Sequence, residues 1–238
     1  GTDGATSITT DSNGDIYITG QQNSHELSST SLPGSYNAFA LKIDGSNRTQ
    51  SDYVEIGAST DDYGQGIAVA ADGNIILQKL DKDDFSSSLW SYDFGDLGAG
   101  GEIGKVVVEG NRVYVSGSSN NSLTGGGTEL TAPIGGLDNF VLALDDNGGS
   151  ASADWTKFIG SDNTDRNGAL TVAAGKIYLT GTTSGGVDEN GLQGGTDSFA
   201  VKMDGTTGAT DWTRQIGYST ENREATGIAF ATLGTSVL

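Results

Sequence analysis

The sequence predicts an all-β protein in which a four-stranded antiparallel sheet is repeated along the chain, and three observations lead to this prediction. Short apolar runs rich in Val, Ile, Thr, Tyr, Phe and Trp recur over the 238 residues, and Gly, Asn, Asp and Ser bound them. Gly contributes 38 residues without a collagen-like period, and the recurring apolar runs argue against disorder. The same order of runs and turns is found four times, and a fifth copy begins near the end.

The first two strands of each unit are joined by a tight turn of residues that tolerate positive φ, such as Asn13-Gly14 and Asp72-Gly73. The second strand alternates aliphatic residues with Tyr or Thr, and it aligns the units. With its turn, it is expected at residues 12–20, 71–78, 109–117, 174–181 and 233–238. The first strand is expected at residues 7–10, 66–70, 105–109, 169–173 and 227–231.

A long polar loop leads to the third strand in units one, three and four. This strand is expected at residues 37–44, 138–145 and 197–204, with a Phe in the same place in each, namely Phe39, Phe140 and Phe199. The fourth strand carries one aromatic residue and ends at a Gly. These aromatic residues are Tyr53, Trp90, Trp155 and Trp212, and the glycines are Gly57, Gly95, Gly160 and Gly217. Because all three Trp residues take one position, we expect this side chain to pack between neighbouring sheets.

Four sequential antiparallel strands form a β-meander, and one such sheet cannot bury both of its faces alone. The sheets are therefore expected to stack face to face around an axis, as the blades of a β-propeller do. The repeats fall at residues 1–57, 58–97, 98–160, 161–217 and, in part, 218–238. The expected domain thus shows about four blades and part of a fifth.

Unit four carries the clearest motifs, which are GKIYLTG, GGTDSFAVKMD and DWTRQIG, at residues 175–181, 194–204 and 211–217. This order resembles the bacterial SBBP-type β-propeller repeat. Unit one departs from it at Ser35-Tyr36-Asn37, where the repeat has Gly-x-Asp. Members of that family are mostly parts of large secreted or surface proteins. The resemblance therefore implies a bacterial protein located outside the cell or on its surface.

Unit two is abnormally short. From the turn glycine to the Asp that ends the third strand, it runs only from Gly73 to Asp81, whereas unit four runs from Gly175 to Asp204. Fusing the second and third strands would leave the fourth strand running the wrong way. Two hypotheses follow: either this blade is irregular, or about twenty residues of the protein are missing between Leu77 and Lys79.

Charge and composition restrict the partners. With 12 Lys and Arg against 31 Asp and Glu, the net charge of −19 makes nucleic acid and anionic lipid poor partners. The absence of Cys excludes disulfides, thiolate zinc sites and a thiol nucleophile. No apolar run approaches the roughly 20 residues of a membrane helix, so no membrane insertion is expected in this segment. The chain opens and stops partway through units, which predicts a segment of a longer polypeptide.

The best binding candidates are the three long loops between the second and third strands, at residues 21–36, 118–136 and 182–195. Within them, four charged or ionisable residues are the candidate ligand contacts: His25, Glu26, Asp188 and Glu189. A single His with no Cys cannot complete a transition-metal site. The sequences GGLDNF and GGTDSF lack the period of calcium-binding nonapeptide repeats, and we expect them to lead into third strands.

Calcium is the only cofactor for which the sequence offers candidate ligands. The loops from the fourth strand to the next unit carry two carboxylates each, which could hold Ca²⁺ together with backbone carbonyls. The candidate ligands are Asp61, Asp62, Asp162 and Asp165. Their alternative role is in solvated turns.

The repeats, the acidity and the lack of catalytic clusters favour a non-catalytic extracellular β-propeller. It would act in structural assembly, adhesion or protein–protein interaction, with other proteins or copies of itself as partners at the cell surface. One alternative is a propeller that binds a polar ligand or carbohydrate. Another is an enzyme, because the phrase DGTTGATDW at residues 204–212 resembles the repeat of quinoprotein dehydrogenase propellers. An enzyme would need converging carboxylates, Arg or His near the axis, and the sequence indicates no such set.

Overall fold

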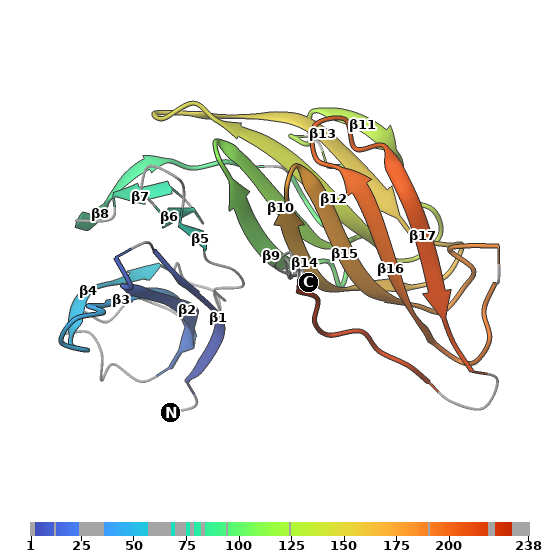
Figure 1. The fold of residues 1–238 in the computed structure, drawn as a ribbon, viewed down its shortest axis with the longest axis horizontal. Helices are drawn as coiled ribbons and strands as arrows, with labels where there is room; N and C mark the ends of the chain where they lie inside the picture. Colours follow the sequence, from blue (N-terminus) through green and yellow to red (C-terminus); the bar gives the residue numbers. More distant parts are fainter. Residues whose placement is uncertain are drawn as a thin grey trace, which may run out of the picture.

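The computed structural model describes residues 3–11, 13–23, 36–56, 68–69, 75–76, 79–81, 84–93, 95–123, 125–189, 191–218 and 222–229. In these residues all regular structure is β-strand, and four separate sheets follow one another along the chain (Figure 1). The fold is all-β and of the β-propeller type. We call the sheets blades 1 to 4, in chain order.

Blades 1 and 4 are simple antiparallel meanders, in which each strand pairs with the next. Blade 1 consists of β1 (Gly4–Thr10), β2 (Ile16–Gln22), β3 (Asn37–Ile43) and β4 (Gln50–Ile56). Blade 4 consists of β14 (Asp165–Ala173), β15 (Lys176–Thr183), β16 (Asp197–Asp204) and β17 (Thr210–Ile216). The turn glycines Gly14 and Gly175 have φ of 85° and 70°, the left-handed conformation that the sequence signal predicts.

Blade 2 keeps four strands by shortening three of them. They are β5 (Ala68–Val69), β6 (Ile75–Ile76), β7 (Lys79–Asp81) and β8 (Asp84–Trp90). β6 and β7 pair in the antiparallel direction, with Ile76 opposite Lys79, so the alternation of strand direction is preserved. The structure thus has the form of the irregular-blade hypothesis. That residues are missing between Leu77 and Lys79 stays a prediction.

Blade 3 has an additional strand that the sequence reasoning missed. It contains β9 (Glu102–Glu109), β10 (Arg112–Ser119), β11 (Thr128–Thr131), β12 (Asp138–Asp146) and β13 (Ala151–Ile159). The order across the sheet is β11-β13-β12-β10-β9, and β11 runs parallel to the outer strand β13. The prediction of a long loop at residues 118–136 is therefore wrong at residues 118–119, which end β10, and at residues 128–131, which form β11. The loop folds back over the sheet edge, where unpaired backbone groups of β13 can bond to it.

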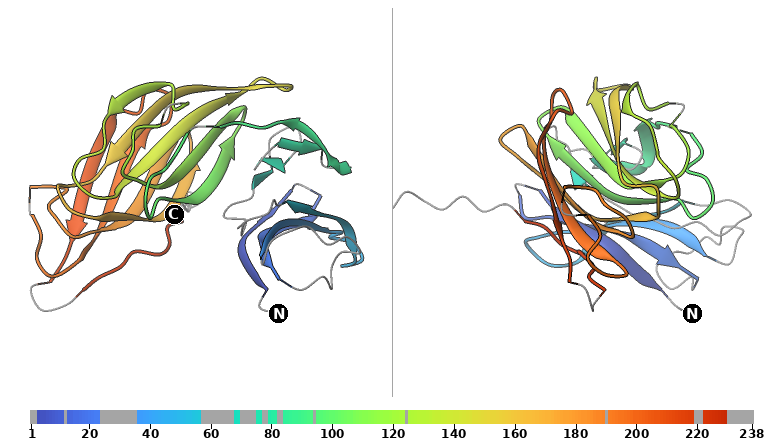
Figure 2. Two further views of the ribbon diagram at one scale, coloured as in Figure 1. Left: turned by 180° about the vertical axis from the view of Figure 1, so that it is seen from behind. Right: turned by 90° about the vertical axis from the view of Figure 1, so that its right-hand side faces the viewer.

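The blades are arranged radially. The first strands lie toward the inside, where β1 contacts β5, β5 contacts β9 and β9 contacts β14. Figure 1 shows the fourth strands β4, β8, β13 and β17 on the outside, and Figure 2 shows the same arrangement from behind and edge-on. This order from inside to outside is that of propeller blades.

Both faces of blade 3 are buried, which explains why β12 is buried along almost its whole length. On one face, Val113, Phe140, Leu142 and other apolar residues pack with Trp90 from blade 2. On the other face, Val141, Ala143 and Trp155 pack with Ile177 and Leu179 from blade 4, among others. Alternate residues of one strand therefore enter two different cores, as the period of a strand dictates.

The chain after blade 4 departs from the expectation. Residues 222–229 contain no strand, so the predicted strand at 227–231 is wrong in its described part, residues 227–229. They do lie against blade 4, because the Arg223 N–H donates to the Thr196 carbonyl at 2.9 Å. Among the described residues, there is no helix that is long and apolar enough to cross a membrane.

Candidate functional site

Four of the predicted site residues can be placed in the structure. His25, Glu26, Asp61 and Asp62 lie outside the described residues. Asp188 accepts the backbone N–H of Gln215 at 2.6 Å through its Oδ2 atom, so it fastens its loop to the outer strand β17. Glu189 is exposed beside it. The structure therefore gives Asp188 a structural bond.

The calcium candidates in the loop before blade 4 do not converge. Asp162 is exposed, whereas Asp165 is fully buried and is the first residue of β14 rather than part of a loop. The Oδ2 atom of Asp165 accepts the backbone N–H of Ser161 at 2.7 Å and its hydroxyl at 3.0 Å. In the part of the chain that the structure describes, no three His, Cys, Asp or Glu side chains are grouped to hold a metal ion.

The Gly-Gly-x-Asp segments lead into third strands, as predicted. In blade 3 the backbone N–H of Ile134 donates to Oδ2 of Asp138, and in blade 4 that of Gln193 donates to Oδ2 of Asp197 at 2.8 Å. Each Asp therefore closes a turn with the residue four positions before it. The glycine at Gly135 has φ of 83° and lies against the backbone of Asp162, so a side chain there would be both strained and obstructed.

Asp138 and Asp165 form a buried carboxyl pair at the joint between blades 3 and 4. Their exposed fractions are 1% and 0%. Both lie around Gly160, since a β-carbon on Gly160 would overlap Oδ1 of Asp138 and lie 2.9 Å from Oδ2 of Asp165. Sequence reasoning found Asp165 but assigned Asp138 only to the start of a strand. The only signal was the repeated glycine that ends the fourth strand, here Gly160.

Burial above all, together with the hydrogen bond and charge of the neighbouring Asp165 carboxyl, raises the pKa of the Asp138 carboxyl to about 7, against a lowering effect of the Ile134 N–H. The desolvation of a charged carboxylate in a water-excluded site causes such a rise. The Asp138 carboxyl can therefore hold a proton near neutral pH.

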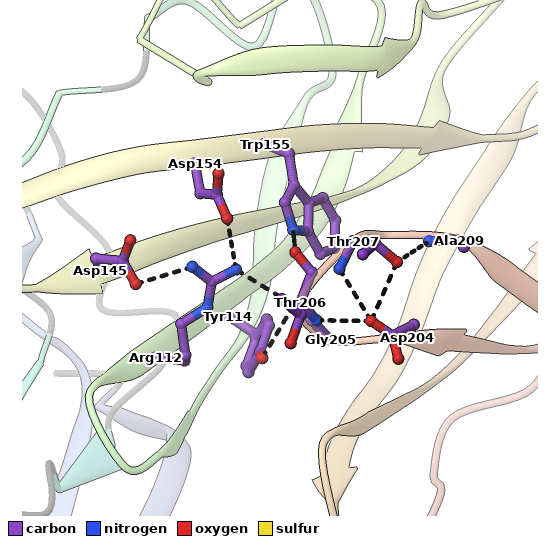
Figure 3. A network of polar contacts seen from close by, with 10 residues as sticks. All are labelled: Arg112, Tyr114, Asp145, Asp154, Trp155, Asp204, Gly205, Thr206, Thr207 and Ala209. Carbon is purple, nitrogen blue, oxygen red and sulfur yellow. Dashed lines mark hydrogen bonds and ion pairs between the residues drawn. The ribbon is translucent and has the colours of Figure 1, made fainter.

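A second polar cluster fastens the outer parts of blades 3 and 4 (Figure 3). The Trp155 indole N–H donates to the Thr206 carbonyl at 3.0 Å, and the Tyr114 hydroxyl donates to the Gly205 carbonyl at 3.1 Å. Both acceptors lie in the turn between β16 and β17. Arg112 reaches the Gly205 carbonyl as well, at 3.3 Å. Two blade 3 side chains with buried rings thus hold one turn of the next blade.

Asp204 shapes the turn that receives these bonds. Its Oδ1 atom accepts the backbone N–H groups of Thr206 at 3.1 Å and Thr207 at 3.0 Å. These bonds, the Thr207 N–H first, together with Lys176, hold the pKa of the Asp204 carboxyl at about 2. The segment DGTTGATDW at residues 204–212 therefore contains the turn between β16 and β17. The Asp204 side chain holds this turn through hydrogen bonds to its backbone.

Arg112 extends this cluster within blade 3. Its guanidinium forms ion pairs of 2.8 Å with both Asp145 and Asp154.

The joint between blades 2 and 3 has a corresponding tryptophan bond, but the acceptor differs. There, the Trp90 indole N–H donates to Oδ1 of Asp146 at 3.0 Å. The prediction that the Trp position packs between sheets is confirmed at both joints.

The outward face of blade 4, which points away from blade 3, is the most exposed apolar surface of that blade. Val201 and Met203 of β16 point to blade 3, so Lys202 between them points outward, as does its partner Trp212. Trp212 is 36% exposed and Ile216 is 61% exposed. We call Lys176, Lys202, Trp212, Arg214 and Ile216 the outward face of blade 4.

No family model matches the chain. A stretch of 149 residues, 60% of the chain, is 30% identical to "Regulatory protein FlaEY" of Caulobacter vibrioides. The chain spans only 15% of that protein's length. Among solved structures, BamB from Moraxella catarrhalis is similar with a TM-score of 0.49 at 16% identity, over 92% of this chain and 55% of the BamB chain.

Proposed function

We propose that the chain is a non-catalytic β-propeller module of a larger bacterial surface or secreted protein, related to the SBBP-type repeats, and that it works by binding protein. The polar side chains that recur between units support this, because they make bonds within or between blades. Asp204 holds a turn, and Tyr114 and Trp155 bind that turn. Groups so engaged are poorly suited to react with a substrate.

The outward face of blade 4 is the observation that carries the proposal. Trp90 and Trp155 are only 7% and 3% exposed, because the following blade covers them. Trp212 takes the same position in its blade and is 36% exposed. Exposed aromatic and aliphatic residues on one sheet face are typical of a protein-binding surface.

A further blade is the element that fits this face, because the sequence predicts a fifth unit after blade 4 and residues 222–229 already lie against that blade. For the 238-residue chain, we propose that a second copy supplies this blade. Elsewhere in the molecule, the equivalent face of a blade is covered by the following blade. In that blade, an Asp side chain accepts backbone N–H groups of the turn that receives the Trp side chain. Blade 1 has such a turn, in which Asp44 Oδ1 accepts the N–H groups of Ser46 at 2.8 Å and Asn47 at 3.1 Å. The Trp212 indole would donate to this turn as Trp155 does to Thr206.

The charges on this face are largely compensated within the blade. Lys176 and Lys202 form ion pairs with Asp204 and Asp211, whereas Arg214 is exposed and can meet an acidic group of the partner. The apolar side chains are therefore expected to supply most of the contact. Head-to-tail contacts of this kind build closed rings or filaments, which suits a role in assembly.

The matched stretch of FlaEY supports a binding role in a larger protein. That relative is named a regulatory protein, and the chain spans a small part of it. A module of this kind would act through contacts rather than through chemistry. Adhesion or assembly at the cell surface is the form of that role that we propose.

Sedimentation velocity on the 238-residue chain tests the partner. We expect association that increases with concentration, starting from the 24.3 kDa monomer. The double variant Trp212→Glu with Ile216→Glu should stay monomeric, because it places two charges in the apolar contact. Ile134→Glu is the control, since Ile134 is 53% exposed but belongs to blade 3. A wild-type chain that stays monomeric, or a double variant that associates equally, would overturn the proposal.

A further inference from the structure

The joint between blades 3 and 4 contains two acidic residues, Asp138 and Asp165. In the described part of the chain, neither forms a salt bridge with a basic residue. Asp138 begins β12 and Asp165 begins β14, and the Asp165 N–H donates to the Leu137 carbonyl at 2.6 Å. Each carboxyl group has one oxygen already bonded, to Ile134 and to Ser161 respectively. The Oδ1 atom of each is buried and accepts no hydrogen bond.

Two adjacent ionised carboxylates are unstable in such a place. Burial removes the water that would solvate both charges, and the charges repel each other. The other charged residues close to Asp165 in the sequence are Asp162 and Arg166, and both are exposed to solvent. The segment at residues 132–137 and the end of β10 at Ser118 and Ser119 contribute no titratable side chain. The negative charge of the two carboxylates must therefore be neutralised by something other than a neighbouring side chain.

The other units solve the same problem with different residues. In unit one, Asn37 occupies the position of Asp138, so one of the two groups there is neutral. After blade 4, Arg223 takes the position of Asp165, because its N–H bonds the Thr196 carbonyl as that of Asp165 bonds Leu137. Only the joint between blades 3 and 4 places Asp against Asp in the described residues.

We propose that the Asp138 and Asp165 carboxyl groups share one proton, so that the joint between blades 3 and 4 is strengthened in acid and weakened when the proton is lost. The proton converts two acceptors into a donor and an acceptor, which satisfies both buried oxygens. A calcium ion fits less well. It takes 6–8 oxygen ligands, whereas only the two Oδ1 atoms remain available from these carboxylates.

The direction of the pH dependence follows from the raised pKa of Asp138, about 7, compared with its ordinary value of 3.8. Between these values the folded chain keeps a proton that the unfolded chain has lost. The stability contributed by the pair is therefore fully present below about pH 4 and is lost as the pH rises to about 7.

Thermal unfolding of three variants, compared at pH 4.5 and 7.5, tests the proposal. Asp138→Asn keeps an acceptor for Ile134 and supplies an N–H for Asp165 at every pH, as Asn37 could in unit one. Its melting temperature should exceed that of wild type at pH 7.5 by roughly 5 °C more than at pH 4.5. Asp165→Asn should behave alike. Asp162→Asn, which removes a nearby exposed charge, is the matched control and should follow wild type.

A second measurement needs no variant. The ¹³C carboxyl resonance of Asp138 in the wild-type chain should titrate near pH 7. Titration near pH 4 would overturn the proposal, as would identical pH profiles for wild type and Asp138→Asn. An increase in melting temperature with CaCl₂ over EDTA that occurs in wild type but not in Asp138→Asn would also overturn it, because a cation would then occupy the pair.

Discussion

At the scale of single residues, the glycine two positions before the end of the second strand in blades 3 and 4 is explained by the ring opposite it. Gly117 pairs with Phe140 and Gly181 pairs with Phe199 across neighbouring strands. A β-carbon at either position would lie only 2.6–2.7 Å from the ring carbons. The phenyl rings lie over the glycines, and both Phe side chains are completely or almost completely buried. The repeated Gly and Phe are therefore one packing unit.

Replacing Gly117 with Ala should destabilise the protein by about 1–3 kcal/mol, because the added methyl group overlaps the Phe140 ring and the backbone of Glu102. Chemical denaturation of the purified variant measures this change. Gly149→Ala is the control, since a β-carbon there has no atom within 4 Å. If both variants have equal stability, the packing explanation is wrong.

At the scale of elements, the long loops serve as covers for the outer strands. β11 pairs with β13, and the Thr131 hydroxyl donates to the Phe158 carbonyl at 2.6 Å while accepting its N–H at 2.9 Å. In blade 4 the side chain of Gln215 donates to the carbonyls of Gly185 and Gly191. Both loops thus protect strand edges that would otherwise pair with other chains.

Replacing Thr131 with Val removes both hydroxyl bonds at nearly constant shape, and we expect a loss of about 1–2 kcal/mol. The amide of Phe158 should exchange with solvent faster, which hydrogen–deuterium exchange measures residue by residue. Thr128→Val, in the same strand, should leave Phe158 protected. Unchanged exchange in Thr131→Val would mean that the backbone pairing alone holds β11.

At the scale of the whole molecule, acidic side chains dominate. Arg112 and Lys176 each contact two carboxylates, yet 31 acidic residues face only 12 basic ones. The excess negative charge repels itself more strongly in the folded chain than in the expanded unfolded chain. Exposed charges are screened by salt, with a Debye length of about 10 Å at 0.1 M.

We therefore expect the melting temperature to rise by several degrees when NaCl is raised from about 0.02 M to about 0.5 M, because the added salt screens the repulsion between carboxylates. Circular dichroism at pH 7.5 measures this change. The variant Asp162→Lys reduces the net negative charge at an exposed position, so it should melt higher than wild type in low salt and show a smaller salt effect. A fall in melting temperature with salt would indicate that the ion pairs outweigh the repulsion.

The strands and their order could be predicted from the sequence because their causes are local. Alternation of side chains, turn residues such as Asn13-Gly14 and the fixed place of Trp155 each depend on a few neighbouring positions. β16 has the expected bounds, and β14 starts four residues earlier than expected, at Asp165. That shift moved a supposed loop carboxylate into the core.

Tertiary structure alone decided the features that depend on distant residues. The pairing of β11 with β13, the contact of Asp138 with Asp165 and the turn that receives Trp155 each join segments that no local pattern connects. The sequence determined which residues form strands, because backbone geometry alternates side chains between two faces. Which face meets which neighbour depends on how the blades stack, since burial and shared charge arise only when two sheets come together.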